Sequence, residues 1–267
     1  MHTASPFLYK AAGSAQDFLT PAVQGTTEVL RGIQRVAASS VRRVILTSSF
    51  AAIGAFGLAD ERNKVYTEED WSPVALADAE ASQDKGLAYL ASKKFAEKAA
   101  WAVHGEAGVG WELVALNPPM VYGPLAHKVR SVDDLNESTA RIWSLFLKEK
   151  KPEGEMPPDG LPLYVDVRDV AKAHVLAMDA SGAGNQRFLL SAGAVMSQQI
   201  ADILRAEVPG AEERVPRGEP GKNTRPADAF SADSSKAEKV FGLKWRSATE
   251  TFAELGRQLL EIERGEM

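Results

Sequence analysis

The residues most able to do chemistry in this sequence are a tyrosine and a lysine four positions apart, Tyr89 and Lys93. Residues four apart lie on one face of a helix, so the phenol and the ammonium can enter one site. Reduction of a carbonyl places negative charge on its oxygen, and a phenol can supply the proton that neutralises it. A nearby ammonium is expected to lower the pKa of Tyr89 by favouring the phenolate. The pair therefore predicts acid–base catalysis of a carbonyl reduction.

Two serines strengthen this interpretation, since alone the pair also suits a helix-face aromatic beside a solvated lysine. Ser48 and Ser49 directly follow the β-branched run 41–47, which predicts a buried strand. Hydroxyls at the carboxyl end of a parallel strand lie where open α/β sheets bind ligands. One serine is expected to hydrogen-bond the substrate carbonyl and the other to cap the turn.

The elements that must position these residues alternate between helices and strands. Apolar periodicity predicts helices at 18–38 and 86–104, and apolar runs predict strands at 41–47 and 111–116. This order implies parallel strands joined by crossover helices, and hence an α/β sheet. Residues 60–85 are acidic and irregular, and they predict a long surface loop. Later segments predict helices at 136–151, 168–178, 197–207 and 248–263, extended chain at 163–167 and 187–190, and loops at 152–162 and 209–228.

Composition excludes several classes of function. The net charge is 31 − 36 = −5, so neither nucleic acid nor a membrane surface is expected as a partner. The chain has no cysteines, which excludes disulfides and fits a reducing, cytoplasmic location. Its four histidines are scattered without metal-ligand spacing, so no metal site is expected. No apolar run reaches the roughly 20 residues of a membrane span, and the first residues do not form a secretory signal.

Six segments occur together along nearly the whole chain: His2–Pro6, Pro21–Thr26, Leu46–Ser49, Tyr89–Lys93, Asn117–Pro124 and Val165–Ala171. With these segments the chain resembles an extended short-chain dehydrogenase/reductase of the NAD-dependent epimerase/dehydratase superfamily. It is most similar to the branch of dihydroflavonol reductases, cinnamoyl-CoA reductases and fungal ketone and aldehyde reductases. The resemblance implies NAD(P)H-dependent reduction of a small ketone or aldehyde to an alcohol by hydride transfer. It also implies NADP(H) in preference to NAD(H), and a homodimer.

The resemblance assigns roles to individual residues. Ser49 matches the catalytic serine, and Tyr89 matches the catalytic acid. Lys93 matches the lysine that lowers the tyrosine pKa and bonds the nicotinamide ribose. Arg168 and Asp169 are interpreted as structural rather than catalytic. The positions that match cofactor-binding segments are Thr3, Ala4, Ser5, Pro118, Pro119, Met120 and Val121, together with Tyr89 and Lys93.

The implied fold is a partial doubly wound, Rossmann-like parallel sheet with a small C-terminal substrate lobe. Residues 1–124 are expected to form the partial dinucleotide-binding domain, with core strands also from about 163–195, and residues 125–267 mostly the substrate lobe. The family opens with a strand, a GxxGxxG turn that cradles pyrophosphate, and a helix, and this motif does not occur here. We therefore expect missing N-terminal strands, largely lost adenine and pyrophosphate binding, and an exposed edge at the strand of Val44.

Three further interpretations remain open at this point. Met1 is expected to be an internal methionine of a longer reading frame, which a soluble, NADPH-binding product of this length would refute. A sugar-nucleotide epimerase or dehydratase shares the serine, tyrosine and lysine, and would use basic residues to bind its diphosphate. The candidates for that role are Arg141, Lys148, Lys150 and Lys151, although such a charge run is typical of a solvated face. An inactive fragment that binds a partner through an open sheet edge is the non-enzymatic alternative.

Overall fold

The computed structural model describes residues 1–3 and 14–266. The chain forms two compact units, each assembled from three segments of the sequence. The predicted division near residue 124, and the roles given to the two parts, stay predictions. The first unit contains Met1–Pro119, Lys172–Leu190 and Phe230–Leu243, and the second contains Met120–Ala171, Ser191–Ala229 and Lys244–Met267.

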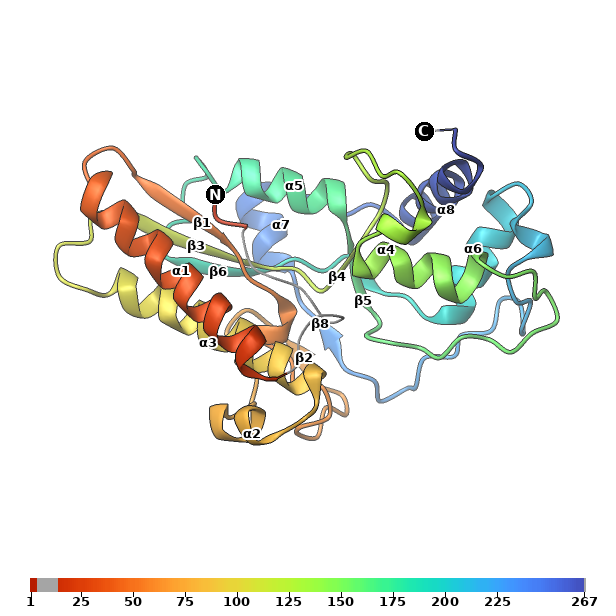
Figure 1. Ribbon diagram of the computed structural model, residues 1–267, viewed down its shortest axis with the longest axis horizontal. Helices are drawn as coiled ribbons and strands as arrows, with labels where there is room; N and C mark the ends of the chain where they lie inside the picture. Colours follow the sequence, from red (N-terminus) through yellow and green to blue (C-terminus); the bar gives the residue numbers. More distant parts are fainter. Residues whose placement is uncertain (4–13, 267) are drawn as a thin grey trace. The chain divides into compact units, whose positions relative to one another are not determined.

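The first unit is built on a parallel sheet in the order β1–β3–β6 (Figure 1). The strands are β1 (Arg43–Thr47), β3 (Glu112–Asn117) and β6 (Gln186–Leu189). Parallel neighbours require crossover connections, and α3 (Lys85–His104) provides the one between β1 and β3. The predicted α/β fold with a parallel, Rossmann-like sheet is therefore confirmed.

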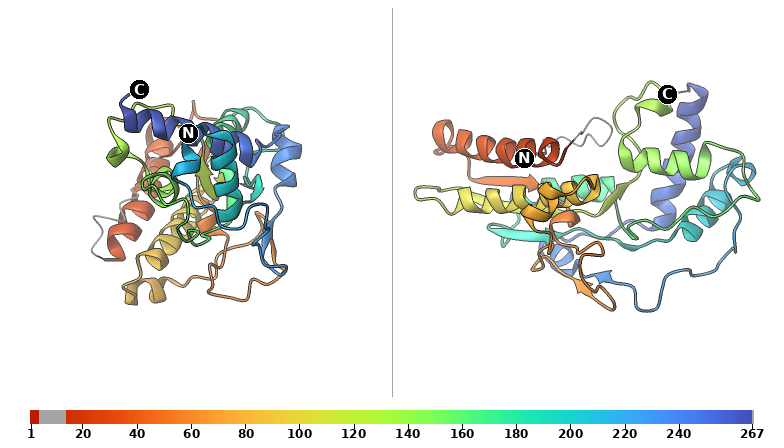
Figure 2. Two further views of the ribbon diagram at one scale, coloured as in Figure 1. Left: turned by 90° about the vertical axis from the view of Figure 1, so that its right-hand side faces the viewer. Right: turned by 60° about the horizontal axis from the view of Figure 1, so that its bottom comes forward.

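Successive side chains of β1 point to opposite faces of this sheet, and different helices cover the two faces. Val44 and Leu46 pack in one apolar cluster with Leu30 of α1 (Gln16–Val36) and with residues of α3. On the other face, Thr47 Oγ1 lies 2.6 Å from Nε2 of His174, in α5 (Val167–Leu176). Helices α1 and α3 lie alongside each other (Figure 2). Coverage of both faces explains the nearly continuous apolar character of the strand.

Strand β1 forms the edge of this sheet in the part of the chain that the structure describes. Its outer side is met there by a single bridge between His2 and Leu46. The His2 N–H donates to the carbonyl of Ile45 at 2.8 Å, and the Thr47 N–H donates to the carbonyl of His2 at 3.0 Å. Within the described residues β1 is thus an edge strand that His2 partly covers, and the expected absence of further strands stays a prediction.

The second unit combines a small mixed sheet with a helical core. Its strands follow the order β4–β5–β7, with β4 parallel and β7 antiparallel to β5. The apolar core is formed by side chains of the sheet and the helices, including Tyr122, Phe146, Leu204 and Phe252. Among the described residues no helix is both long and apolar enough to cross a bilayer. The elements are β4 (Met120–Tyr122), α4 (Glu137–Ile142), a π-helical turn (Trp143–Leu147), β5 (Leu163–Asp166), β7 (Gly193–Ala194), α6 (Ser197–Glu207) and α8 (Ala248–Arg264).

The prediction of one continuous loop at residues 60–85 is wrong. This region contains a two-residue strand, β2 (Val65–Tyr66), and a six-residue helix, α2 (Leu76–Ala81). Strand β2 pairs with β8 (Ser231–Ala232). Neither β8 nor α7 (Ser235–Phe241), which follows it, was predicted. Strands of two residues and helices of six or seven residues are too short to display a strand or helical period.

Gly256 allows α8 to pack closely on α6. A Cβ atom at this position would lie 2.6 Å from Cδ2 of Leu204 and 2.9 Å from Cγ2 of Val208. Alanine improves helix propensity by about 1 kcal/mol, whereas overpacking costs about 1–3 kcal/mol. We expect Gly256→Ala to lower the free energy of unfolding in urea by about 1 kcal/mol. The control is Gly25→Ala in α1, where a Cβ meets nothing within 4 Å, and where we expect a gain.

Candidate active site

Helix α3 places Tyr89 and Lys93 beside Ser49, which follows the end of β1. The helix is fixed at its start by Asp84, whose Oδ1 accepts the N–H of Gly86 at 2.7 Å. The Ser49 side chain hydrogen-bonds the phenol of Tyr89. Nζ of Lys93 lies over the same ring, 5.7 Å from its centroid. The structure therefore brings together the serine, tyrosine and lysine that the sequence singled out.

The chain around Ser49 is held between the ends of two strands. Ser49 Oγ accepts the N–H of Ala51 at 3.1 Å and so caps a short 3-10 turn. The Phe50 N–H donates to the carbonyl of Pro118 at 2.9 Å, and Nδ2 of Asn117 donates to the carbonyl of Ser49 at 3.1 Å. Ser49 thus caps the turn and bonds Tyr89, whereas Ser48 Oγ donates to Glu97. A hydrogen bond from either serine to a substrate carbonyl stays a prediction.

The electrostatics of Tyr89 differ from the prediction. Burial raises the pKa of the Tyr89 phenol, and the hydrogen bond from Ser49 offsets only part of that rise. The expected lowering of this pKa by Lys93 is not found, because the phenol is buried and the ammonium lies over the ring face. Burial also lowers the pKa of Lys93. The phenol is therefore protonated at neutral pH, which is the form that can donate to a carbonyl oxygen.

Lys93 is suited to bind part of a nicotinamide cofactor. Its partly buried ammonium makes no hydrogen bond or ion pair with the described residues, so its N–H donors are available to a ligand. The hydroxyls of a ribose are acceptors that match these donors. A pyrophosphate needs a glycine-rich turn after a strand, and the sequence has none. The residues present therefore fit the nicotinamide-ribose end of the cofactor.

The N-terminal residues lie near Lys93. The pKa of His2 is lowered by burial first, and then by the charges of the chain's N-terminus and of Lys93. Thr3, a predicted cofactor residue, is exposed beside His2. Ala4 and Ser5 lie outside the described residues, so their predicted role stays a prediction.

The proline-rich segment after β3 contains the remaining predicted cofactor residues. Pro118 is buried and accepts the hydrogen bond from Phe50 described above, and Pro119 is partly exposed. Met120 and Val121 belong to β4 of the second unit, where both are partly exposed. Contact of these four residues with a cofactor stays a prediction.

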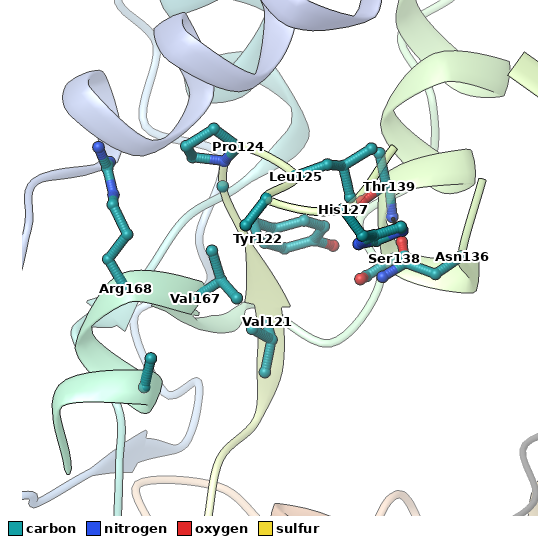
Figure 3. Close-up of a pocket in the computed structure, with 13 residues that line it drawn as sticks. Val121, Tyr122, Pro124, Leu125, His127, Asn136, Ser138, Thr139, Val167 and Arg168 are labelled. Atoms are coloured by element: carbon teal, nitrogen blue, oxygen red, sulfur yellow. Dashed lines mark hydrogen bonds between the residues drawn. The ribbon is translucent and has the colours of Figure 1, made fainter. Parts of the chain in front are cut away.

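The second unit contains a pocket of about 270 Å³. Its walls are mostly apolar, and the hydroxyl of Tyr122 points toward the side that His127, Asn136 and Ser138 line (Figure 3). Burial raises the pKa of Tyr122, and its phenol is hydrogen-bonded to Arg141. An apolar pocket with a polar end suits a small organic molecule.

The Val165–Ala171 segment forms ion pairs that hold the second unit together. Asp166 is fully buried and accepts hydrogen bonds from Arg168 and from Thr251 Oγ1, at 2.8 and 2.9 Å. Asp169 is also buried and pairs with Arg246. These contacts support the structural interpretation of Arg168 and Asp169, each with a different partner. Within residues 1–3 and 14–266 no three His, Asp or Glu side chains are placed to hold a metal ion.

Sequence reasoning missed one carboxylate in the first unit. Glu97 lies four residues after Lys93 on α3, and its side chain is fully buried. It forms an ion pair with Arg187 of β6, with 2.6 Å between Oε1 and Nε. The available signal was the four-residue spacing, which continues from Tyr89 and Lys93 to a third polar residue on the same face of the helix.

Comparison with known proteins shows close relatives. Residues 2–190 match the NAD dependent epimerase/dehydratase family. The chain is 38% identical over 268 residues to the NADPH-dependent methylglyoxal reductase GRE2 of Saccharomyces cerevisiae, a match that covers 98% of this chain and 76% of that protein. It is 34% identical over 262 residues to the ketoreductase azaE of Aspergillus niger, with coverage of 98% and 75%.

Solved structures agree with these matches. The crystal structure of yeast methylglyoxal/isovaleraldehyde reductase Gre2 complexed with NADPH superposes with a TM-score of 0.88 at 37% identity, covering 98% of this chain and 76% of that one. Gre2 of Candida albicans in complex with NADPH gives a TM-score of 0.86 at 31% identity, with coverage of 97% and 75%. The chain therefore belongs to the NAD-dependent epimerase/dehydratase family.

Proposed function

We propose that this chain reduces the carbonyl group of a small aldehyde or ketone to an alcohol, with NADPH as the reductant. The observation that carries the proposal is the convergence of Ser49, Tyr89 and Lys93. The serine hydroxyl bonds the phenol, and the ammonium lies over the same ring. A protonated phenol and a hydroxyl side by side can both bond one carbonyl oxygen.

The three side chains divide the work at the carbonyl oxygen. When bound, the reduced nicotinamide supplies the hydride that reaches the carbonyl carbon. Ser49 orients the carbonyl and stabilises the charge that develops on its oxygen. Tyr89 transfers its proton to that oxygen, which completes the alcohol, and then regains a proton from solvent. Lys93 holds the ribose hydroxyls through N–H donors that no described residue uses.

The identity of the relatives supports the class of substrate and the cofactor. The yeast relative is named for methylglyoxal and for NADPH, and its crystal structure is named for methylglyoxal and isovaleraldehyde. The Aspergillus relative is named a ketoreductase. Small aldehydes are therefore the first substrates to test, with NADPH preferred to NADH.

The basic segment does not favour a sugar nucleotide as the substrate. Lys150 forms an ion pair with Glu213, and Lys151 forms one with Glu149. Arg141 is hydrogen-bonded to Tyr122 and to the carbonyl of Pro158. Three of the four candidate cations thus have partners within the protein. The solved structure of MoeE5 with UDP-glucuronic acid and NAD shares 21% identity, which supports a common fold alone.

The test is oxidation of NADPH by the purified chain with methylglyoxal, isovaleraldehyde and a set of ketones. We expect a rate that requires both the protein and the carbonyl compound, and that is higher with NADPH than with NADH. UDP-glucose tests the alternative activity, and we expect no epimerised or dehydrated sugar nucleotide when the products are separated by chromatography. A rate equal to that without protein for every carbonyl compound would contradict the proposal.

A further inference from the structure

The first unit contains a carboxylate whose hydrogen bonds lead to the catalytic group without touching the reacting atoms. Glu97 Oε2 accepts from Ser48 Oγ at 2.5 Å and from Asn117 Nδ2 at 2.7 Å. Glu97 Oε1 accepts from Arg187 Nε at 2.6 Å and from Trp101 Nε1 at 3.2 Å. Both oxygens are therefore fully engaged, and the side chain is completely shielded from solvent.

Two of the four donors to Glu97, Ser48 and Asn117, also fix the chain at Ser49. Ser48 immediately precedes Ser49, and its N–H donates to the carbonyl of Leu116 at 2.8 Å. Asn117 uses the same Nδ2 to bond Glu97 and the carbonyl of Ser49. Glu97 thus holds Ser49 in place through Ser48 and Asn117. It does so from α3, the helix that also carries Tyr89 and Lys93.

The cationic partner of this carboxylate is equally well fixed. The Arg187 guanidinium stacks on the ring of Trp71 at 3.7 Å from its centroid, and it donates to the carbonyls of Glu68 and Asp70. A buried ion pair is seldom worth more to stability than apolar residues of the same shape. Its value lies in geometry, because two donors on each oxygen hold the Glu97 carboxylate in one orientation.

We propose that Glu97, held by Arg187, is a positioning residue that keeps the Ser49 hydroxyl against the phenol of Tyr89. This rests on the proposed carbonyl reduction, which it deepens. Tyr89, Lys93 and Glu97 form one stripe of α3, at intervals of four residues. In this proposal Tyr89 acts on the substrate, Lys93 binds the cofactor ribose, and Glu97 fixes the strand ends against the helix.

The test combines Glu97→Gln with Ser49→Ala in a double-mutant cycle. Glutamine has the same shape, and its oxygen is expected to stay toward the Arg187 cation. Its N–H₂ then faces the donors of Ser48 and Asn117, so their arrangement must shift. A misplacement of this kind can lower kcat by about 10²-fold, and we expect KM to change much less. If Glu97 acts through Ser49, its effect on kcat must largely disappear in the Ser49→Ala background. An equal loss in both backgrounds would overturn the proposal.

The matched control is Asp169→Asn, which removes a buried charge paired with Arg246 in the second unit. It should cost stability and leave kcat unchanged. If Glu97→Gln does not fold, Ser48→Ala removes one donor to the carboxylate and should still lower kcat. A fully active Ser48→Ala variant would then overturn the proposal.

A second readout does not depend on turnover or cofactor. Carbon-13 NMR of ring-labelled tyrosine reports the titration of Tyr89, whose signal is assigned by its loss in Tyr89→Phe. Because the Ser49 hydrogen bond lowers the pKa of Tyr89, Glu97→Gln should raise this pKa further. An unchanged Tyr89 titration would refute the positioning role. Absence of reductase activity in the unaltered chain, with the NMR shift present, would refute only the proposed function.

Discussion

Replacing Tyr89 with phenylalanine is expected to lower kcat/KM for carbonyl reduction by about 10²–10⁴-fold, the range of general acid catalysis. Phenylalanine keeps the ring beneath the Lys93 ammonium and removes the hydroxyl that bonds Ser49. The variant should therefore fold normally while losing the proton donor. The measurement is the initial rate of NADPH oxidation with methylglyoxal at neutral pH, where the phenol of the unaltered chain is protonated.

The matched control for this prediction is Tyr164→Phe in the second unit. The Tyr164 hydroxyl makes one long hydrogen bond, 3.4 Å to the carbonyl of Arg246, and burial raises its pKa to about 12. Burial raises the pKa of Tyr164 as it does that of Tyr89, but the Tyr164 hydroxyl bonds a backbone carbonyl instead of a serine side chain. We expect Tyr164→Phe to keep the rate of the unaltered chain. If the two variants are equally active, a group other than Tyr89 donates the proton.

The long elements around the site were predictable because their sequences are periodic. Helices α1 and α3 have 21 and 20 residues, which is long enough to show their apolar faces. Strand β1 was visible as a β-branched run that ends in serines. The four-residue spacing placed Tyr89 and Lys93 together, since helix geometry fixes this relation locally.

The contacts that fix the site could not be predicted, because they join distant parts of the chain. Arg187 lies 90 residues from Glu97, and Ser48 lies 49 residues from it. No local pattern indicates that these side chains meet at one point. The net effect on the Tyr89 pKa also depends on burial, which is a property of the folded chain and not of the spacing.

Replacing Lys93 with methionine is expected to separate activity from stability. The ammonium is the one group of the three with donors free for a ribose, so kcat/KM should fall by about 10²-fold. Its loss should also weaken NADPH binding, measured by calorimetry. Methionine has a similar length and no charge, and it can occupy the partly buried site on α3 without desolvating an ammonium. The temperature and urea midpoints of unfolding should therefore rise.

The pH dependence of this gain in stability follows from the sign of the shift. Burial lowers the pKa of Lys93 in the folded state, so the folded chain binds that proton less tightly than the unfolded chain does. The cost to stability is fully present below the folded pKa, and it decreases as pH rises from the folded pKa toward the unfolded value of about 10.4. The advantage of Lys93→Met should shrink over the same interval.

Lys172→Met, the same change at an exposed position on α5, should alter neither activity nor this pH dependence. If the free energy of unfolding depended on pH equally in the two variants, burial would not destabilise the Lys93 ammonium. The role of Lys93 would then rest on ligand binding alone.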